Sequence, residues 1–174
     1  EEEIPFEIPE SWEWVRLGKI GLVQTGTTPP KTHPEYFNGD IPFIKPADIT
    51  TKGINYNNES LTKLGITKGR LIEQNSVMMV CIGGSIGKAY FTEQITSCNQ
   101  QINAITPFSS ISTKLVFSFM STFFFLESVK RNATGTATPI INKNLWSNLV
   151  IPLPPLEEQK RIVSKLEEIM PLID

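Results

Sequence analysis

The sequence is poor in the side chains that do most catalytic and metal-binding work. Its single histidine, His33, leaves little room for a Ser-His-Asp triad or a histidine-based metal site. Its two cysteines, Cys81 and Cys98, make no disulfide framework, and no further ligands accompany them at zinc spacing. Because Cys81 lies within an apolar run (residues 77–82), we expect it to be a buried free thiol.

Long hydrophobic runs are also missing. The longest, at residues 115–126, has twelve residues and is interrupted by Ser118, Ser121 and Thr122, whereas a membrane-spanning helix needs about 20. The first residues are acidic, unlike the basic and then apolar start of a secretory signal. These features predict a soluble, cytoplasmic protein.

Motifs for nucleotide or methyl-transfer chemistry are incomplete. At residues 83–88 three residues separate Gly83 from Gly87, and Ala89 follows Lys88, whereas a phosphate-binding loop needs four residues there and Ser or Thr after the lysine. This segment is more typical of a turn between strands. Neither Pro-Pro pair has the Asp or Asn before it and the aromatic residue after it that an adenine methyltransferase needs. We therefore predict a chain without catalytic activity or cofactor.

Enough apolar sequence is present for one well-packed domain. The chain has 174 residues, of which 40% are hydrophobic and 20% charged, which excludes a disordered tract. Its net charge of −2 is unevenly distributed: residues 1–10 carry −5, residues 11–155 carry +5 and residues 156–174 carry −2. A mildly basic body between acidic ends permits a polyanionic partner.

Short apolar runs between turn-forming residues predict an α+β fold of short mixed strands with a few helices. We expect strands of five or six residues, and Ser112 is a suitable cap for one helix running to about Arg131. These strands are residues 41–45, 77–82, 87–91 and 101–106, and two further strands are expected at 12–16 and 149–151. Three regions follow from the pattern: an acidic lead-in (1–10), a domain (11–154) and a terminal helix (155–174).

The terminal helix has an amphipathic pattern. Pro155 suits its first position and Glu157 and Glu158 its first turn, while Pro171 should kink it or end it near Met170. Apolar residues at coiled-coil spacing predict a subunit interface. These residues are Ile162, Val163, Leu166, Ile169, Met170 and Ile173.

Several loops combine basic and hydrogen-bonding side chains, a composition that favours nucleic-acid binding. Asn and Gln side chains can bond adenine edges bidentately, but residues 99–101 could equally hold a strand in place by bonding backbone groups. The candidate DNA-binding residues are Thr27, Thr28, Lys31, Lys45, Gly84, Ser85, Lys88, Asn99, Gln100, Gln101, Arg131, Thr134, Thr136 and Lys143.

Five segments make the chain resemble the specificity subunit of Type I restriction–modification enzymes. The most specific is Ile-Pro-Leu-Pro-Pro-Leu-Glu-Glu-Gln at residues 151–159, where a recognition domain would meet a helix. The others are residues 8–18, 41–49, 99–102 and 135–143. The similarity extends from about residue 8 to residue 174.

This resemblance implies one target recognition domain that reads half of a bipartite DNA site, followed by the first turns of a long spacer helix. The implied partners are double-stranded DNA, methyltransferase and restriction subunits, and a second recognition domain or a second copy through the helix. S-adenosylmethionine, ATP and Mg would belong to the partner subunits. The alternative is a non-catalytic, β-rich protein-interaction module with a docking helix.

Overall fold

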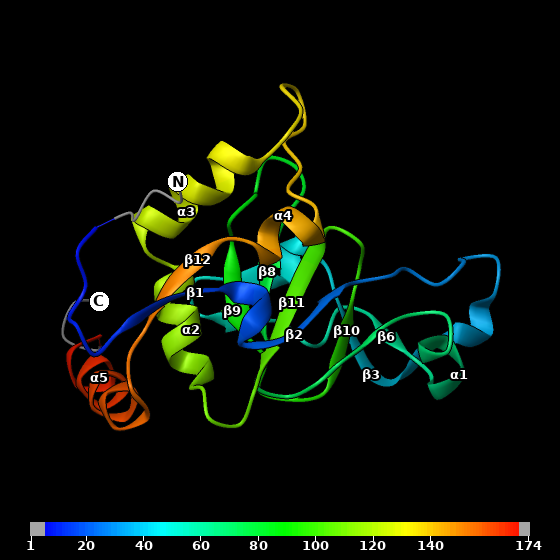
Figure 1. The fold of residues 1–174 in the computed structure, drawn as a ribbon. Helices are drawn as coiled ribbons and strands as arrows, with labels where there is room; N and C mark the ends of the chain where they lie inside the picture. The colour runs from blue at the N-terminus through cyan, green and yellow to red at the C-terminus, as the bar shows by residue number, and fades with distance from the viewer. Residues whose placement is uncertain (1–5, 171–174) are drawn as a thin grey trace.

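The structure is a computed structural model that describes residues 6–170, and its centre is a four-stranded antiparallel sheet (Figure 1). The strands run in the order β2 (Gly21–Thr25), β11 (Ile102–Pro107), β8 (Val77–Val80) and β9 (Ala89–Phe91). All four residues of β8 are buried, with Val77 and Met79 in one core cluster and Met78 and Val80 in the other. A strand buried on both faces lies in the middle layer of a three-layer domain.

A second four-stranded sheet covers one face of the central sheet. Its order is β6 (Ser60–Leu61), β3 (Phe37–Ile44), β10 (Thr96–Cys98) and β7 (Leu71–Ile72). Strand β10 pairs parallel with β3 and antiparallel with β7. Ile44, Ile72 and Cys98 pack here against Met78 and Val80 of the central sheet.

Helices cover the other face of the central sheet. They are α2 (Thr113–Met120), α3 (Phe123–Asn132) and α4 (Lys143–Ser147). Val116, Phe125 and Trp146 from these helices share a core with Val77 and Met79. Helix α5 (Leu156–Ile169) packs against α2 rather than on the sheet (Figure 1). The α+β class expected from the sequence is therefore confirmed.

Smaller elements complete the domain. Strand β1 (Glu13–Arg16) pairs antiparallel with β12 (Val150–Leu153), which joins the two ends of the described chain. The rest are β4 (Ile49–Thr50), β5 (Gly53–Ile54), α1 (Lys63–Ile66) and the 3-10 turns η1 (Leu17–Lys19), η2 (Pro34–Tyr36) and η3 (Pro46–Asp48).

The prediction of one helix from Ser112 to Arg131 is wrong. Ser112 does cap α2, because its Oγ accepts a hydrogen bond from the Leu115 N–H. The helix then stops at Ser121, and Thr122 caps α3 by accepting a bond from the Phe125 N–H. Hydroxyl side chains compete for backbone groups, so a Ser-Thr pair inside an apolar run can end one helix and begin another. The prediction of strands of five or six residues is also wrong for most strands, since several have only two to four.

Helix α5 begins one residue later than predicted. Pro155 is its N-cap, with an extended φ of −55° and ψ of 151°, and is not the first helical residue. The helix ends at Ile169 with Met170 as C-cap, near the predicted position. Pro171 and Ile173 lie outside the described residues. None of the helices among residues 6–170 is long and apolar enough to cross a membrane.

Both cysteines are free and buried, which confirms the prediction for Cys81. Cys81 is 2% exposed and Cys98 is fully buried. Burial disfavours the charged thiolate and raises the pKa of each thiol to about 12. These thiols are therefore packing groups of the two core clusters and are protonated at neutral pH.

Candidate nucleic-acid interface

Strand directions bring three loops to one edge of the central sheet, and an isolated bridge between Ile82 and Ile140 adds a fourth. Adjacent antiparallel strands run in opposite directions, so the ends of β2 and β8 lie at the same edge as the starts of β11 and β9. We name the loops the arm (26–33), the amide turn (99–101), the glycine loop (83–87) and the tip loop (133–140). The tip loop is the yellow loop at the top of Figure 1, and the arm runs toward the right.

The arm crosses directly over the chain at the amide turn. The Thr27 N–H donates to the Cys98 carbonyl at 2.9 Å, and the Gly26 N–H donates to the Ile102 carbonyl at 3.0 Å. A Cβ at Gly26 would lie 2.1 Å from the Asn99 carbonyl oxygen, so only glycine permits this approach. The two loops therefore form one rigid unit.

Cys81 connects the amide turn to the tip loop. Its N–H donates to the Gln101 carbonyl at 2.7 Å, while its carbonyl accepts from the Ile141 N–H at 2.9 Å. The glycine loop joins the same row, because the Gly83 N–H donates to the Pro139 carbonyl at 2.9 Å. Backbone hydrogen bonds thus hold the arm, the amide turn, the glycine loop and the tip loop side by side. We call this set the loop row.

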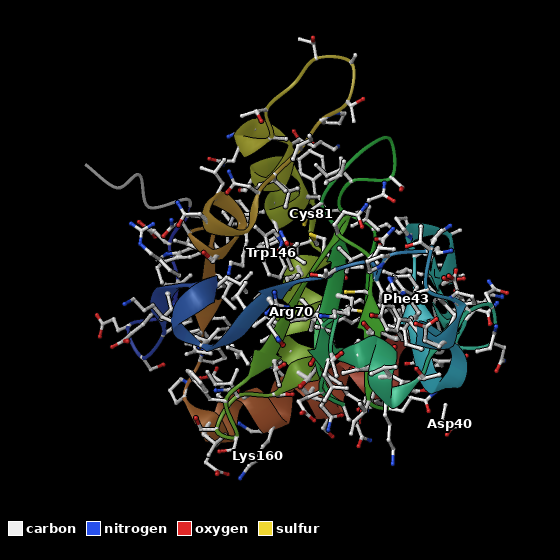
Figure 2. The ribbon with its side chains drawn as sticks, turned by 90° about the vertical axis from the view of Figure 1, so that its right-hand side faces the viewer. Asp40, Phe43, Arg70, Cys81, Trp146 and Lys160 are labelled. Carbon is white, nitrogen blue, oxygen red and sulfur yellow. The ribbon has the colours of Figure 1, made fainter. Side chains whose placement is uncertain are left out.

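The loop row contains no carboxylate and is flanked by positive charge. The four loops contain Lys31 and no Asp or Glu, and Lys88, Arg131 and Lys143 lie within three residues of them. The Glu35 carboxylate, two residues beyond the arm, contacts His33. Helix α5 differs, since it contains four glutamates and three basic residues. Figure 2 shows Lys160 of α5 at the bottom of the molecule and the tip loop at the top. The surface that can attract an anion is therefore at the loop end of the domain.

Three of the predicted basic residues are available to a ligand. Lys31, Arg131 and Lys143 are exposed, and none takes part in an ion pair among residues 6–170. Thr134 and Thr136 of the tip loop are also exposed, between Arg131 and Lys143. These five side chains present charges and hydroxyl groups to solvent from the two ends of the loop row.

The other two predicted lysines have protein partners. The Lys45 ammonium group pairs with Glu59, and the Lys88 ammonium group donates to the Pro46 carbonyl at 3.1 Å. Both side chains are half-buried near the end of β3. They lie beside the loop row, but an anion would have to compete with these partners for them.

The amide side chains of the amide turn differ in their exposure to solvent. Asn99 is 8% exposed; its Nδ2 donates to Gln101 Oε1 at 3.0 Å and its Oδ1 accepts from the Gln101 N–H at 3.1 Å. These bonds hold the turn and leave Asn99 inaccessible. Gln100 is exposed, and its Oε1 accepts a hydrogen bond from the Thr28 hydroxyl at 2.6 Å. Of the three amides, Gln100 is therefore the one that faces solvent freely.

The glycine loop is an exposed turn between β8 and β9. Gly84 and Ser85 are exposed, and a Cβ at Gly83 or Gly84 would meet no atom within 4 Å. Gly83 and Gly87 have φ of 89° and 92°, the left-handed region that favours glycine. The structure confirms a turn between strands. A phosphate-binding loop is followed by a helix, whereas a strand follows this loop, as expected for a turn between strands.

Carboxylates and metal ligands do not gather at this edge. Asp48 is 3% exposed and caps η3 by accepting the Lys45 N–H at 2.8 Å, which is a structural role. Among the described residues no group of three or more His, Cys, Asp or Glu side chains could hold a metal ion.

Sequence reasoning missed Arg70, which follows α1 and precedes β7. No periodicity marks a strand of two residues, so local pattern does not show where this side chain lies. The pairing of β7 with β10 brings Arg70 close to the residues that precede the amide turn.

Comparison with known proteins gives one family. The family model of the Type I restriction modification DNA specificity domain matches residues 9–174. The chain is 29% identical over 169 residues to the HindI specificity subunit of Haemophilus influenzae, covering 92% of this chain and 37% of that protein. It is also 29% identical over 164 residues to the EcoR124I/EcoR124II specificity subunit of Escherichia coli, covering 90% of this chain and 40% of that protein.

Solved structures show the same fold. The crystal structure of the HsdS subunit from Thermoanaerobacter tengcongensis matches with a TM-score of 0.77 and 21% identity, over 98% of this chain and 40% of that one. A chain from a structural study of assembly of the type I R-M system matches with a TM-score of 0.75 and 22% identity, over 98% and 41%. The chain thus spans about two fifths of each of these relatives.

Proposed function

Because the chain belongs to the family of Type I restriction modification DNA specificity domains, we propose that it reads one half of a bipartite DNA target as a recognition domain of a specificity subunit. The observation that carries this proposal is the loop row: four loops, hydrogen-bonded side by side at one edge of a sheet, that contain no carboxylate and have four basic residues in them or within three residues of them. Duplex DNA is a dense array of negative charge, and neutralising its phosphates supplies most of the sequence-independent affinity.

Within the loop row we assign two kinds of contact. Lys31, Arg131 and Lys143 bind phosphates, because their charges are exposed and have no ion-pair partner among residues 6–170. Gln100 reads a base edge in the major groove, where a glutamine amide can bond adenine N6 and N7 together. The Thr28 hydroxyl holds the Gln100 amide in position for this contact.

We assign the chain no catalytic step. Methyl transfer and cleavage belong in this proposal to methyltransferase and restriction subunits, which would also hold S-adenosylmethionine, ATP and Mg, and the complex would act in the cytoplasm. Helix α5 is the start of a spacer helix that docks a methyltransferase subunit or a second recognition domain. Ile169 and Met170, which belong to its apolar residues at coiled-coil spacing, are 37% and 57% exposed. Exposed apolar side chains of this kind mark interaction sites.

The alternative is a protein-interaction module that uses α5 for docking and has no nucleic-acid role. A salt titration of DNA binding by the complete enzyme separates the two functions. For a DNA reader, log affinity falls linearly with log salt, with a slope of about −0.9 for each phosphate neutralised. Three phosphate contacts from the loop row therefore contribute about −2.7 to the slope. Absence of salt-dependent binding to a duplex that contains the target would favour the interaction module.

A further inference from the structure

Arg70 lies at the amide turn because of the pairing of β7 with β10. In this antiparallel pair Ser97 is opposite Leu71 and Thr96 is opposite Ile72. Extending the register by one residue places Arg70 opposite Cys98, the residue immediately before the amide turn. Residues directly opposite each other in an antiparallel pair have Cβ atoms about 4.5–5.5 Å apart. Cys98 is buried and Arg70 is exposed, so the Arg70 side chain starts beside Cys98 and extends from there to the surface.

The start of the arm lies against the same residue of β10. A Cβ at Gly26 would lie 2.6 Å from Cys98 Sγ, so the arm passes directly over the Cys98 side chain. The charge of Arg70 acts on the same thiol, where it opposes the effect of burial on the Cys98 pKa. Arg70 and the start of the arm are therefore both neighbours of Cys98, which lies two residues before Gln100, the partner of Thr28 (Figure 2 labels Arg70).

The Arg70 side chain is free to bind an anion. It is exposed and takes part in none of the ion pairs found between residues 6 and 170. Strand β7 is the edge strand of its sheet and pairs with β10, which ends immediately before the amide turn, so no further strand of this sheet covers Arg70. A cation beside a groove-reading loop lies where the sugar–phosphate backbone of a bound duplex passes.

We propose that Arg70 binds a DNA phosphate at the arm end of the loop row, next to the Thr28–Gln100 hydrogen bond. This inference rests on the proposed function. The planar guanidinium group can bond two phosphate oxygens at once, which fixes the register of the duplex against Gln100.

The test measures DNA affinity of the complete enzyme across a range of salt concentrations, for a duplex with its target and for one without. Arg70→Ala should lower affinity for both duplexes by the same factor, about threefold to tenfold at moderate salt, and reduce the salt slope by about 0.9. Arg70→Lys, which keeps the charge, should retain the wild-type slope. The control Lys19→Ala removes one exposed positive charge before the opposite end of β2 and should change neither quantity.

Two results would overturn the proposal for Arg70. One is an Arg70→Ala variant with wild-type affinity and slope, and the other is a loss confined to the target duplex, which would make Arg70 a base reader. Melting temperatures of the variants show whether a loss reflects unfolding. If the wild-type enzyme itself lacks salt-dependent binding, the proposed function fails, a result distinct from a failure of Arg70 alone.

Discussion

The Thr28 hydroxyl donates a hydrogen bond to Gln100 Oε1 at 2.6 Å, across 72 residues of sequence. This bond joins the side chains of the arm and the amide turn at the surface, above the backbone bond from Thr27 to Cys98. It leaves the Gln100 amide nitrogen directed away from Thr28 and without a partner among residues 6–170. A fixed amide with a free donor and an accessible acceptor suits recognition of an adenine edge.

Removal of the Gln100 amide should therefore change sequence preference. Gln100→Ala in the complete enzyme is expected to relax selection at one base pair of the target, with a loss of discrimination of about 1–3 kcal/mol. Sequencing of methylated sites from cells that carry the variant measures this directly. Thr28→Val should weaken selection at the same base pair to a smaller extent. Thr28→Ser, which keeps the hydroxyl group, should leave that selection unchanged.

Asn99→Ala is the matched control for Gln100→Ala. Asn99 is buried and bonds Gln101, so its loss should lower the melting temperature without a new preference at that base pair. If Gln100→Ala instead leaves the methylated sequence unchanged and only lowers the melting temperature, the amide turn is purely structural.

Lys31→Ala should weaken binding to all DNA sequences alike. The Lys31 ammonium group is exposed on the arm and has no ion-pair partner among the described residues. Loss of one phosphate contact should reduce the slope of log affinity against log salt by about 0.9. Lys52→Ala, in the hairpin between β4 and β5, removes an equal charge away from the loop row and should have no effect. A selective loss for one sequence would contradict a phosphate contact.

The sequence predicts the loops of this surface better than their arrangement. The amide turn, the glycine loop and the tip loop are recognisable because glycine, asparagine and threonine cluster between apolar runs. What local pattern cannot show is which loops are neighbours, because this depends on pairings such as that of β11 with β2 and β8. Arg70 was missed for this reason: the two-residue strand β7 brings it to the amide turn.

The incorrect prediction of a single helix from Ser112 to about Arg131 has a similar cause. Apolar spacing between Leu115 and Leu126 predicts one continuous helix, and the pattern does not change at Ser121 and Thr122. In the structure the Thr122 hydroxyl donates to the Phe119 carbonyl at 2.7 Å and caps the next helix. Because the chain changes direction at this break, Phe125 and Val129 of α3 pack in the core. Tertiary packing selects the capped alternative over the continuous one.

Helix α5 should contribute to the stability of the domain through Gln159. This side chain is 3% exposed; its Oε1 accepts from the Ser112 N–H at 3.1 Å and its Nε2 donates to the Pro154 carbonyl at 3.1 Å. Gln159→Ala leaves both backbone groups unpaired and should lower the free energy of unfolding by about 1–3 kcal/mol, measured in urea. The exposed control Gln74→Ala should be neutral. Equal stability of the two variants would mean that α5 is not docked in solution.

The exposed end of α5 should matter for assembly and not for folding. Ile169→Glu with Met170→Glu places two charges on the exposed part of the apolar face of α5. Copurification with a methyltransferase subunit should be abolished, while the melting temperature stays within a few degrees of the wild type. Ser164→Glu, which lies on the opposite side of the helix, should assemble normally. Assembly of the double variant would show that the apolar face of α5 is not an interface.

If the loop row is the surface that meets DNA, binding of DNA should change backbone hydrogen exchange of the complete enzyme in these four loops. Exchange is compared with and without a duplex that contains the target. Exchange should become slower on DNA binding in the arm, the amide turn, the glycine loop and the tip loop, with no change in the β4–β5 hairpin at residues 49–54. Protection of that hairpin or of α5, with unchanged exchange in all four loops, would contradict DNA binding at the loop row.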